Sequence, residues 1–179
     1  MLKRILYRFK QFFFAMTASM FEEDRVYARQ YLDIKESAFF FGLPDYEQKH
    51  SVIVAQKMQK FAHNRTDLDI KLLVRLGLLH DIGKAATRLS VIDKSLLVIL
   101  QHFLHPLYDY LASKGADDRS FFLFRKFYVH KNHGRIGSEM LKRVGVDPKL
   151  SARIFEHDEN PIEFRDEYMK ILNQSDSTC

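Results

Sequence analysis

The chain has 179 residues, of which 46% are hydrophobic and 28% charged, so it can bury a core and is too apolar for intrinsic disorder. Its single cysteine, Cys179, excludes an intrachain disulfide scaffold and a zinc site built from cysteine thiolates. The net charge of +5 is modest, and no concentrated basic stripe indicates a specific nucleic-acid interface. Such a mild positive field favours small phosphorylated molecules as ligands.

The first twenty residues have the pattern of an amphipathic helix, with Ile5, Phe9, Phe13, Met16 and Met20 on one face. Charged residues interrupt the apolar run too early for a signal peptide or a transmembrane helix, and we expect a cytoplasmic protein. Two interpretations of this helix stay open. It packs against its own domain, or its basic side makes a peripheral contact with an anionic membrane surface.

The spacing of apolar residues then predicts one helix after another. Helices are expected over residues 22–32, from residue 45, from the N-cap Asp69, and over 94–111, 120–130, 135–144, 149–157 and 163–175. The two-residue alternation that indicates strands is absent from the sequence. The sequence therefore predicts an all-α, single-domain helical bundle.

Five of the expected helices each place one metal-binding side chain on their apolar face: His50, His80, His133, His157 and Asp176. Each histidine alone has an ordinary interpretation as a core residue with a hydrogen-bond partner, and Asp176 alone has one as a solvated acid. Burying all five together is costly in free energy unless a shared partner binds their polar atoms. One or two divalent cations would do so, and these donors suit iron, manganese, cobalt or nickel, or magnesium at a carboxylate-rich position.

The segment from Leu78 to Lys84 adds a carboxylate and an ammonium group to this set. His80 and Asp81 are adjacent at a helix end, so both can bind one ion, or the carboxylate can bridge two. Lys84 follows His80 by one helical turn and can hold a phosphoryl oxygen as negative charge develops. Gly83 leaves space where a ligand can approach. An ordinary helix end is the alternative for this segment taken alone.

The order of these residues resembles the HD-domain superfamily of metal-dependent phosphohydrolases. Residues 80–84, His-Asp-Ile-Gly-Lys, match its HDIG subgroup, and the stretches that begin at His133 and Ile154 resemble the blocks that follow. The resemblance covers residues 45–176. It implies an HD domain over residues 41–179, preceded by an N-terminal helical arm over residues 1–40.

The resemblance also implies roles for the matched residues. His50, His80, Asp81 and Asp176 match the four metal ligands common to the superfamily, and His133 and His157 match the added ligands of its two-metal members. Asp81 then bridges the metals, and Lys84 matches a lysine near the scissile phosphate, which makes these two the expected catalytic residues. Asp158 stands where the family often has a second histidine. The Gly-Tyr-Pro element of the cyclic-di-GMP phosphodiesterases does not follow Pro161.

These features predict a phosphomonoesterase or phosphodiesterase that uses metal-activated water to cleave a phosphate ester or anhydride. The expected substrate is a nucleotide. The alternative is a sensor or scaffold of the same fold that binds metal or nucleotide without catalysis. His130 is expected to contact the substrate together with Lys84, or else to support a ligand. The other histidines, His63, His102 and His105, are expected outside the site.

Overall fold

The computed structural model describes residues 18–117, 119–157 and 166–179, and within these ranges it contains helices and no strand. The expected all-α class is therefore confirmed. The elements in chain order are α2 (Glu22–Tyr31), α3 (Ile34–Phe41), α4 (Asp45–Phe61), α5 (Ile70–Leu79), the short 3-10 helix η1 (Ile82–Ala86), α6 (Val91–Phe103), α7 (His105–Lys114), α8 (Phe122–Arg143), α9 (Pro148–Glu156) and α10 (Glu167–Ser177).

Helices α4 and α5 form the centre of the core. Val54 and Met58 of α4 and Leu73 and Leu76 of α5 are fully buried. The two helices approach closely because Gly77 has no side chain: a Cβ there would lie 2.7 Å from the Cα of Ala55. This close pair holds the later elements, since α9 and α10 both contact it.

Local signals explain where several helices begin. The carboxylate of Asp69 accepts a hydrogen bond from the amide of Leu72, as expected of an N-cap. Asp147 accepts one from the amide of Lys149 at the start of α9, where Pro148 occupies the first turn. The sequence analysis did not identify α3, although Asp33 and Glu36 form a reciprocal capping box at its start.

One expected helix is wrong. The helix expected over residues 94–111 is two helices, because the chain leaves helical geometry at Leu104, two residues before Pro106. The helices expected over 120–130 and 135–144 correspond to the two parts of α8, which meet at a kink where Asn132 leaves helical geometry. The Asn132 side-chain amide donates to the carbonyl of Tyr128 at this kink and so satisfies a backbone acceptor there.

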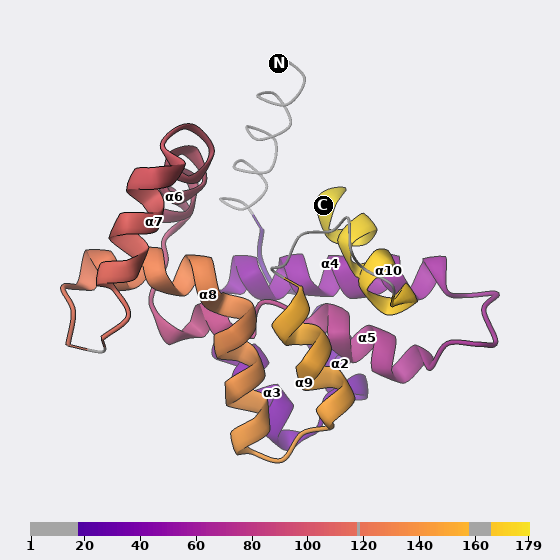
Figure 1. The fold of residues 1–179 in the computed structure, drawn as a ribbon. Coiled ribbons are helices and arrows are strands. Elements are labelled where there is room, and N and C mark those ends of the chain that lie inside the picture. The colour runs from indigo at the N-terminus through magenta and orange to yellow at the C-terminus, as the bar shows by residue number, and fades with distance from the viewer. Residues whose placement is uncertain (1–17, 118, 158–165) are drawn as a thin grey trace.

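Helices α6 and α7 project from the rest of the molecule and are joined to it through α8 (Figure 1). This projection has a small core of its own around Leu89, Leu97 and Tyr108. One face of α6 is apolar and exposed at helical spacing, with Ile92, Leu96, Ile99 and Phe103. Apolar spacing in α6 therefore does not mean burial in the main core.

The N-terminal part of the chain is described only from residue 18. Ala28 of α2 and Phe40 of α3 are fully buried in the same core as α4 and α5. The amphipathic helix expected over the first twenty residues lies, except for its end, outside the described residues. The division into residues 1–40 and 41–179 stays a prediction. In the described ranges, no helix combines the length and the apolar character that crossing a membrane requires.

Candidate metal centre

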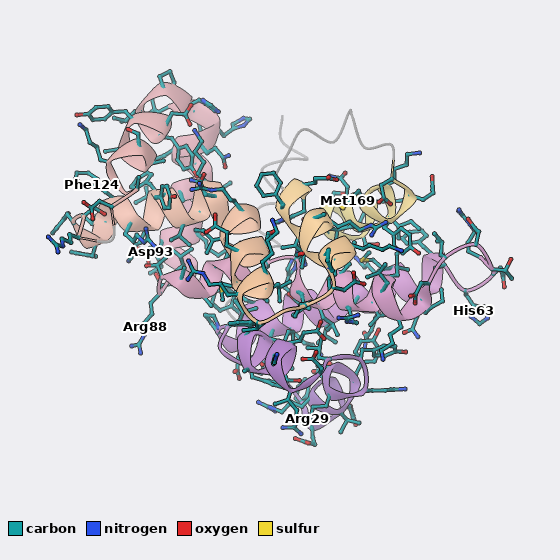
Figure 2. The ribbon with its side chains drawn as sticks, turned by 60° about the horizontal axis from the view of Figure 1, so that its bottom comes forward. Arg29, His63, Arg88, Asp93, Phe124 and Met169 are labelled. Atoms are coloured by element: carbon teal, nitrogen blue, oxygen red, sulfur yellow. The ribbon has the colours of Figure 1, made fainter. Side chains whose placement is uncertain are left out.

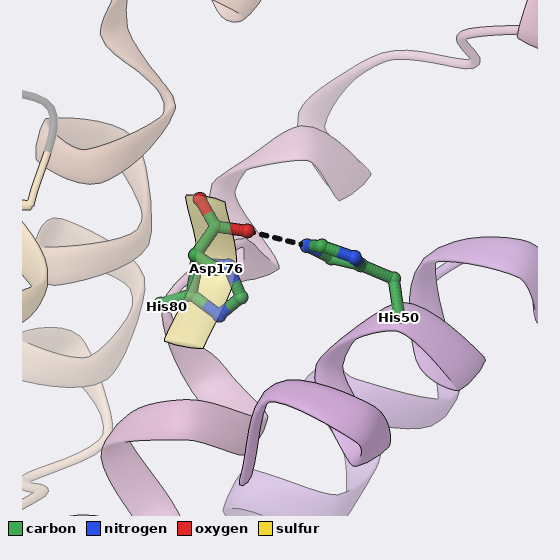
Figure 3. A group of neighbouring side chains, drawn as sticks. All are labelled: His50, His80 and Asp176. Carbon is green, nitrogen blue, oxygen red and sulfur yellow. Dashed lines mark ion pairs between the residues drawn. The ribbon is translucent and has the colours of Figure 1, made fainter. Parts of the chain in front are cut away.

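The first group of candidate ligands joins three elements that are distant in the sequence. His50 comes from α4, His80 follows α5, and Asp176 lies in α10. Each offers one ligand atom, and these atoms all lie within 4.8 Å of one another. The Nε2 atom of His50 is 2.9 Å from Oδ1 of Asp176, and the His80 ring lies beside this pair (Figure 3). The structure thus brings together these three residues selected from the sequence.

The second group contains Asp81, His133 and His157, whose ligand atoms again lie within 4.8 Å of one another. The Oδ1 atom of Asp81 is 3.1 Å from Nε2 of His133 and 3.7 Å from Nε2 of His157. The two imidazole Nε2 atoms are themselves 3.0 Å apart. These distances are close to those between ligands of one divalent ion.

The two groups are neighbours because His80 and Asp81 are consecutive residues, and both are buried. The Oδ2 atom of Asp81 lies 3.4 Å from Nε2 of His80, and the rings of His80 and His157 are 5.5 Å apart. His80 and His157 directly follow the last residues of α5 and α9, so two helix C-termini adjoin the site. Their partial negative charge favours cations.

Hydrogen bonds fix the ring orientation of three of the histidines. The Nδ1 atoms of His80, His133 and His157 each lie 2.9 Å from the carbonyl oxygen three residues earlier in the chain. A carbonyl only accepts, so each Nδ1 carries the hydrogen and donates it. In the neutral ring, Nε2 then has a lone pair directed at the site. This is the usual arrangement of a metal-binding histidine.

The protonation states of the buried groups also suit a cation. Burial lowers the pKa of His80 from 6.5 to about 4, which keeps its ring neutral. Burial alone would raise the pKa of Asp81, but the neighbouring His80, Lys84, His133 and His157 together hold it well below its ordinary value. The pKa of Asp176 is likewise lowered, against the effect of burial, by His50 and His80. The two carboxylates are therefore charged, and the His80 imidazole is neutral and can offer its Nε2 lone pair to a metal ion.

Lys84 lies beside these groups, as expected. Its Nζ is 2.5 Å from Oδ2 of Asp81 and 4.0 Å from Oε2 of Glu47. Burial alone would lower the pKa of Lys84, but the carboxylates of Asp81 and Glu47 raise it above its ordinary value. The ammonium therefore stays charged next to the second group of candidate ligands.

Glu47 and Lys94 adjoin the site and were missed by the sequence analysis. Glu47 lies one turn before His50 in α4 and is buried, and Nζ of Lys94 in α6 is 2.6 Å from its Oε1. Periodicity could have revealed Glu47, which shares a helix face with His50. For Lys94 no local signal exists, since its position beside Glu47 depends on how α7 and α8 place α6.

His130 is next to the site, with one ring nitrogen engaged. Its Nδ1 lies 2.6 Å from the hydroxyl oxygen of Tyr108 in α7. The pKa of His130 is lowered to about 3, mainly by burial and also by the positive charges of Lys84 and Lys94. The ring is therefore neutral and close to both ammonium groups. Contact between His130 and a substrate stays a prediction.

The remaining histidines are exposed, as expected. His63 follows α4 at the edge of the molecule opposite Phe124 (Figure 2). His102 and His105 lie at the junction of α6 and α7, where His105 pairs with Asp109 at 3.1 Å. Asp158, the residue in place of a second family histidine, lies outside the described residues.

The expectation for Gly83 is wrong. A Cβ at Gly83 would lie 1.9 Å from the carbonyl oxygen of His133 and 2.7 Å from the amide nitrogen of Gly137. The space beside Gly83 is therefore filled by the backbone of α8 and not by a ligand. Gly83 acts on the site indirectly, because it lets η1 pack against the turn of α8 that carries His133.

A family model of the HD domain matches residues 48–177, which include both groups of candidate ligands and Lys84. No curated protein and no solved structure matched the chain significantly.

Proposed function

The chain belongs to the HD-domain family, whose members are generally metal-dependent phosphohydrolases, and we propose that it hydrolyses a phosphate ester or anhydride of a small molecule. The observation that carries this proposal is the pair of adjacent ligand groups, His50–His80–Asp176 and Asp81–His133–His157. Both lie within the matched residues.

The donors in these groups fit divalent cations. Imidazole nitrogens and carboxylate oxygens suit iron, manganese, cobalt or nickel, and magnesium suits the carboxylates. His50, His80 and Asp176 would hold one ion and Asp81, His133 and His157 a second, and Asp81 is proposed to contribute to both. When bound, such ions supply Lewis acidity, which lowers the pKa of water and offsets negative charge on a phosphoryl group.

The protein's own residues orient the reacting groups. The Asp81 carboxylate faces His133 and His157 through Oδ1 and Lys84 through Oδ2, so it fixes the direction of the Lys84 ammonium. That ammonium is positioned to donate a hydrogen bond to a phosphoryl oxygen and to stabilise its charge as the bond to the leaving oxygen breaks. The neutral ring of His130 lies on the same side and is proposed to contact the substrate.

The finer assignment concerns subgroup and substrate. Residues 80–84 support membership in the HDIG subgroup, and the positive groups beside the site support a nucleotide as substrate. The lack of a Gly-Tyr-Pro element after Pro161 argues against cyclic di-GMP.

The test is hydrolysis of bis-p-nitrophenyl phosphate by the purified protein loaded with manganese. We expect turnover that a chelator abolishes and that manganese restores. Asp81→Ala should lose both turnover and bound metal, whereas His102→Gln, which changes an exposed histidine, should keep both. Metal binding without turnover would instead support the sensor or scaffold. An Asp81→Ala variant with unchanged metal content would contradict the assigned site.

A further inference from the structure

Glu47 is a buried carboxylate between two lysines from different elements. Its side chain is 1% exposed, and neither of its oxygens has a hydrogen bond of good geometry. Its charge is balanced by ion pairs, with Nζ of Lys94 at 2.6 Å from Oε1 and Nζ of Lys84 at 4.0 Å from Oε2. A buried carboxylate is retained only when such partners compensate for its loss of water. Glu47 therefore holds the two ammonium groups near each other.

The direction of the Lys94 side chain is also fixed by its surroundings. Its Nζ lies 5.4 Å from the centre of the Tyr46 ring, and the Tyr46 hydroxyl donates to the carbonyl of Leu89 at 2.7 Å. The Lys94 side chain keeps 26% of its surface exposed, while that of Glu47 is sealed. The ammonium is thus anchored by Glu47 and Tyr46, while part of the Lys94 side chain reaches solvent.

The two ammonium groups extend the positive part of the site away from Asp81. Lys84 touches Asp81 directly, and Lys94 comes next through Glu47. The Lys84 ammonium is 4.0 Å from Oε2 of Glu47 and the Lys94 ammonium 2.6 Å from its Oε1, so one carboxylate places the two positive groups as neighbours. A phosphoryl group that reacts beside Asp81 and Lys84 would therefore place its neighbouring phosphate at Lys94.

We infer that Lys94, held by Glu47 next to Lys84, binds a second phosphate of the substrate and makes the site prefer phosphate anhydrides to single-phosphate esters. This inference rests on the proposed function, since it places the reacting phosphate at the Asp81 site. It narrows the substrate class to molecules with two or more linked phosphates, such as nucleoside di- or polyphosphates. Helix α6 thereby contributes a specificity-determining residue.

The test compares inorganic pyrophosphate with inorganic phosphate as ligands. Their dissociation constants are measured by calorimetry on manganese-loaded protein from which excess metal has been removed, and the metal content is checked afterwards. Lys94→Gln should weaken pyrophosphate binding about tenfold or more, because it removes a charge-assisted contact. Phosphate binding should change by less than about twofold. Lys131→Gln is the matched control, since Lys131 pairs with Asp109 on the surface.

A Lys94→Gln variant with an unchanged ratio of the two dissociation constants would overturn the inference and leave Lys94 with a structural role only. If the unpaired Glu47 charge prevents this variant from folding, the double variant Glu47→Gln/Lys94→Gln removes both charges. An unchanged ratio of the pyrophosphate and phosphate dissociation constants in the double variant would then overturn the inference. Lys94-dependent pyrophosphate binding without turnover of either bis-p-nitrophenyl phosphate or pyrophosphate would contradict the proposed hydrolysis but support Lys94. Turnover together with pyrophosphate binding that does not depend on Lys94 would contradict only the role of Lys94 and would leave the proposed hydrolysis intact.

Discussion

The Nε2 atoms of His133 and His157 face each other at 3.0 Å, while the Nδ1 atoms of both rings donate to backbone carbonyls. Two ring nitrogens that both present lone pairs repel at this distance unless a proton or a cation lies between them. The neighbouring Oδ1 of Asp81 supplies negative charge at the same point. This geometry supports the proposed second cation position, which is separate from the group that contains His50.

The first prediction concerns metal stoichiometry. The protein purified with excess manganese should contain close to two ions per chain by elemental analysis, because the structure offers two complete donor groups. His157→Gln should lower this number to one, since it removes a donor from the second group only. His102→Gln should leave it at two. A single ion in the unmodified protein would restrict the site to one group.

The second prediction separates Lys84 from the metal ligands. Lys84→Gln should lower kcat about 100- to 1000-fold, the usual cost of losing a group that stabilises developing negative charge. Its metal content should stay unchanged, because Lys84 contacts the Asp81 carboxylate without being a ligand. Lys60→Gln, at an exposed position of α4, serves as the control for charge. A kcat within about tenfold of the unmodified value would remove Lys84 from the reaction.

The third prediction concerns Gly83. Gly83→Ala should lower the free energy of unfolding by about 3 kcal/mol, because the new methyl group collides with the backbone of α8 at His133. It should also lower metal content, since His133 moves with that backbone. Gly42→Ala is the comparison, because there the methyl group would lie 3.3 Å from its nearest neighbours. Equal unfolding midpoints for the two variants in urea would contradict the close approach of η1 and α8.

The fourth prediction concerns acid stability of the metal-free protein. Burial lowers the pKa of His80 from 6.5 to about 4, so between these values the unfolded chain binds a proton that the folded protein does not. The free energy of unfolding should therefore fall as the pH falls through this window, by about 2 kcal/mol at pH 5 relative to pH 7.5. Urea unfolding of chelator-treated protein measures this change.

Two variants assign that pH dependence to His80. His80→Gln should reduce the difference between pH 5 and pH 7.5, because it removes the buried titrating ring. His63→Gln changes an exposed histidine after α4 and should leave the difference as it is. The same pH dependence in both variants would mean that other groups cause it.

Helical periodicity made much of the candidate site predictable. His50, His80 and Asp176 could be assigned to apolar faces from the spacing of their neighbours, and those faces meet because each packs against the same core. Helix starts at Asp69 and Asp147 were predictable because a cap acts within three residues. Local chemistry determines both kinds of feature.

Features that depend on packing between distant segments were not predictable in this way. Gly83 looked like a space for a ligand, but α8 fills that space. The apolar spacing in α6 did not reveal which of its residues are buried, and Ile92 and Phe103 are more than 70% exposed. Lys94 gives no signal in the sequence because only the approach of α6 to α4 brings it to Glu47.

The origin of the first donor group has a consequence for biosynthesis. His50 lies in α4 and Asp176 in α10, so this group combines an early and a late part of the chain. A nascent chain cannot complete it until α10 has emerged from the ribosome. The proposed metal at this position can therefore find its full set of donors only after α10 has been made, and a translation intermediate that stalls before α10 would carry an imidazole pair without its carboxylate.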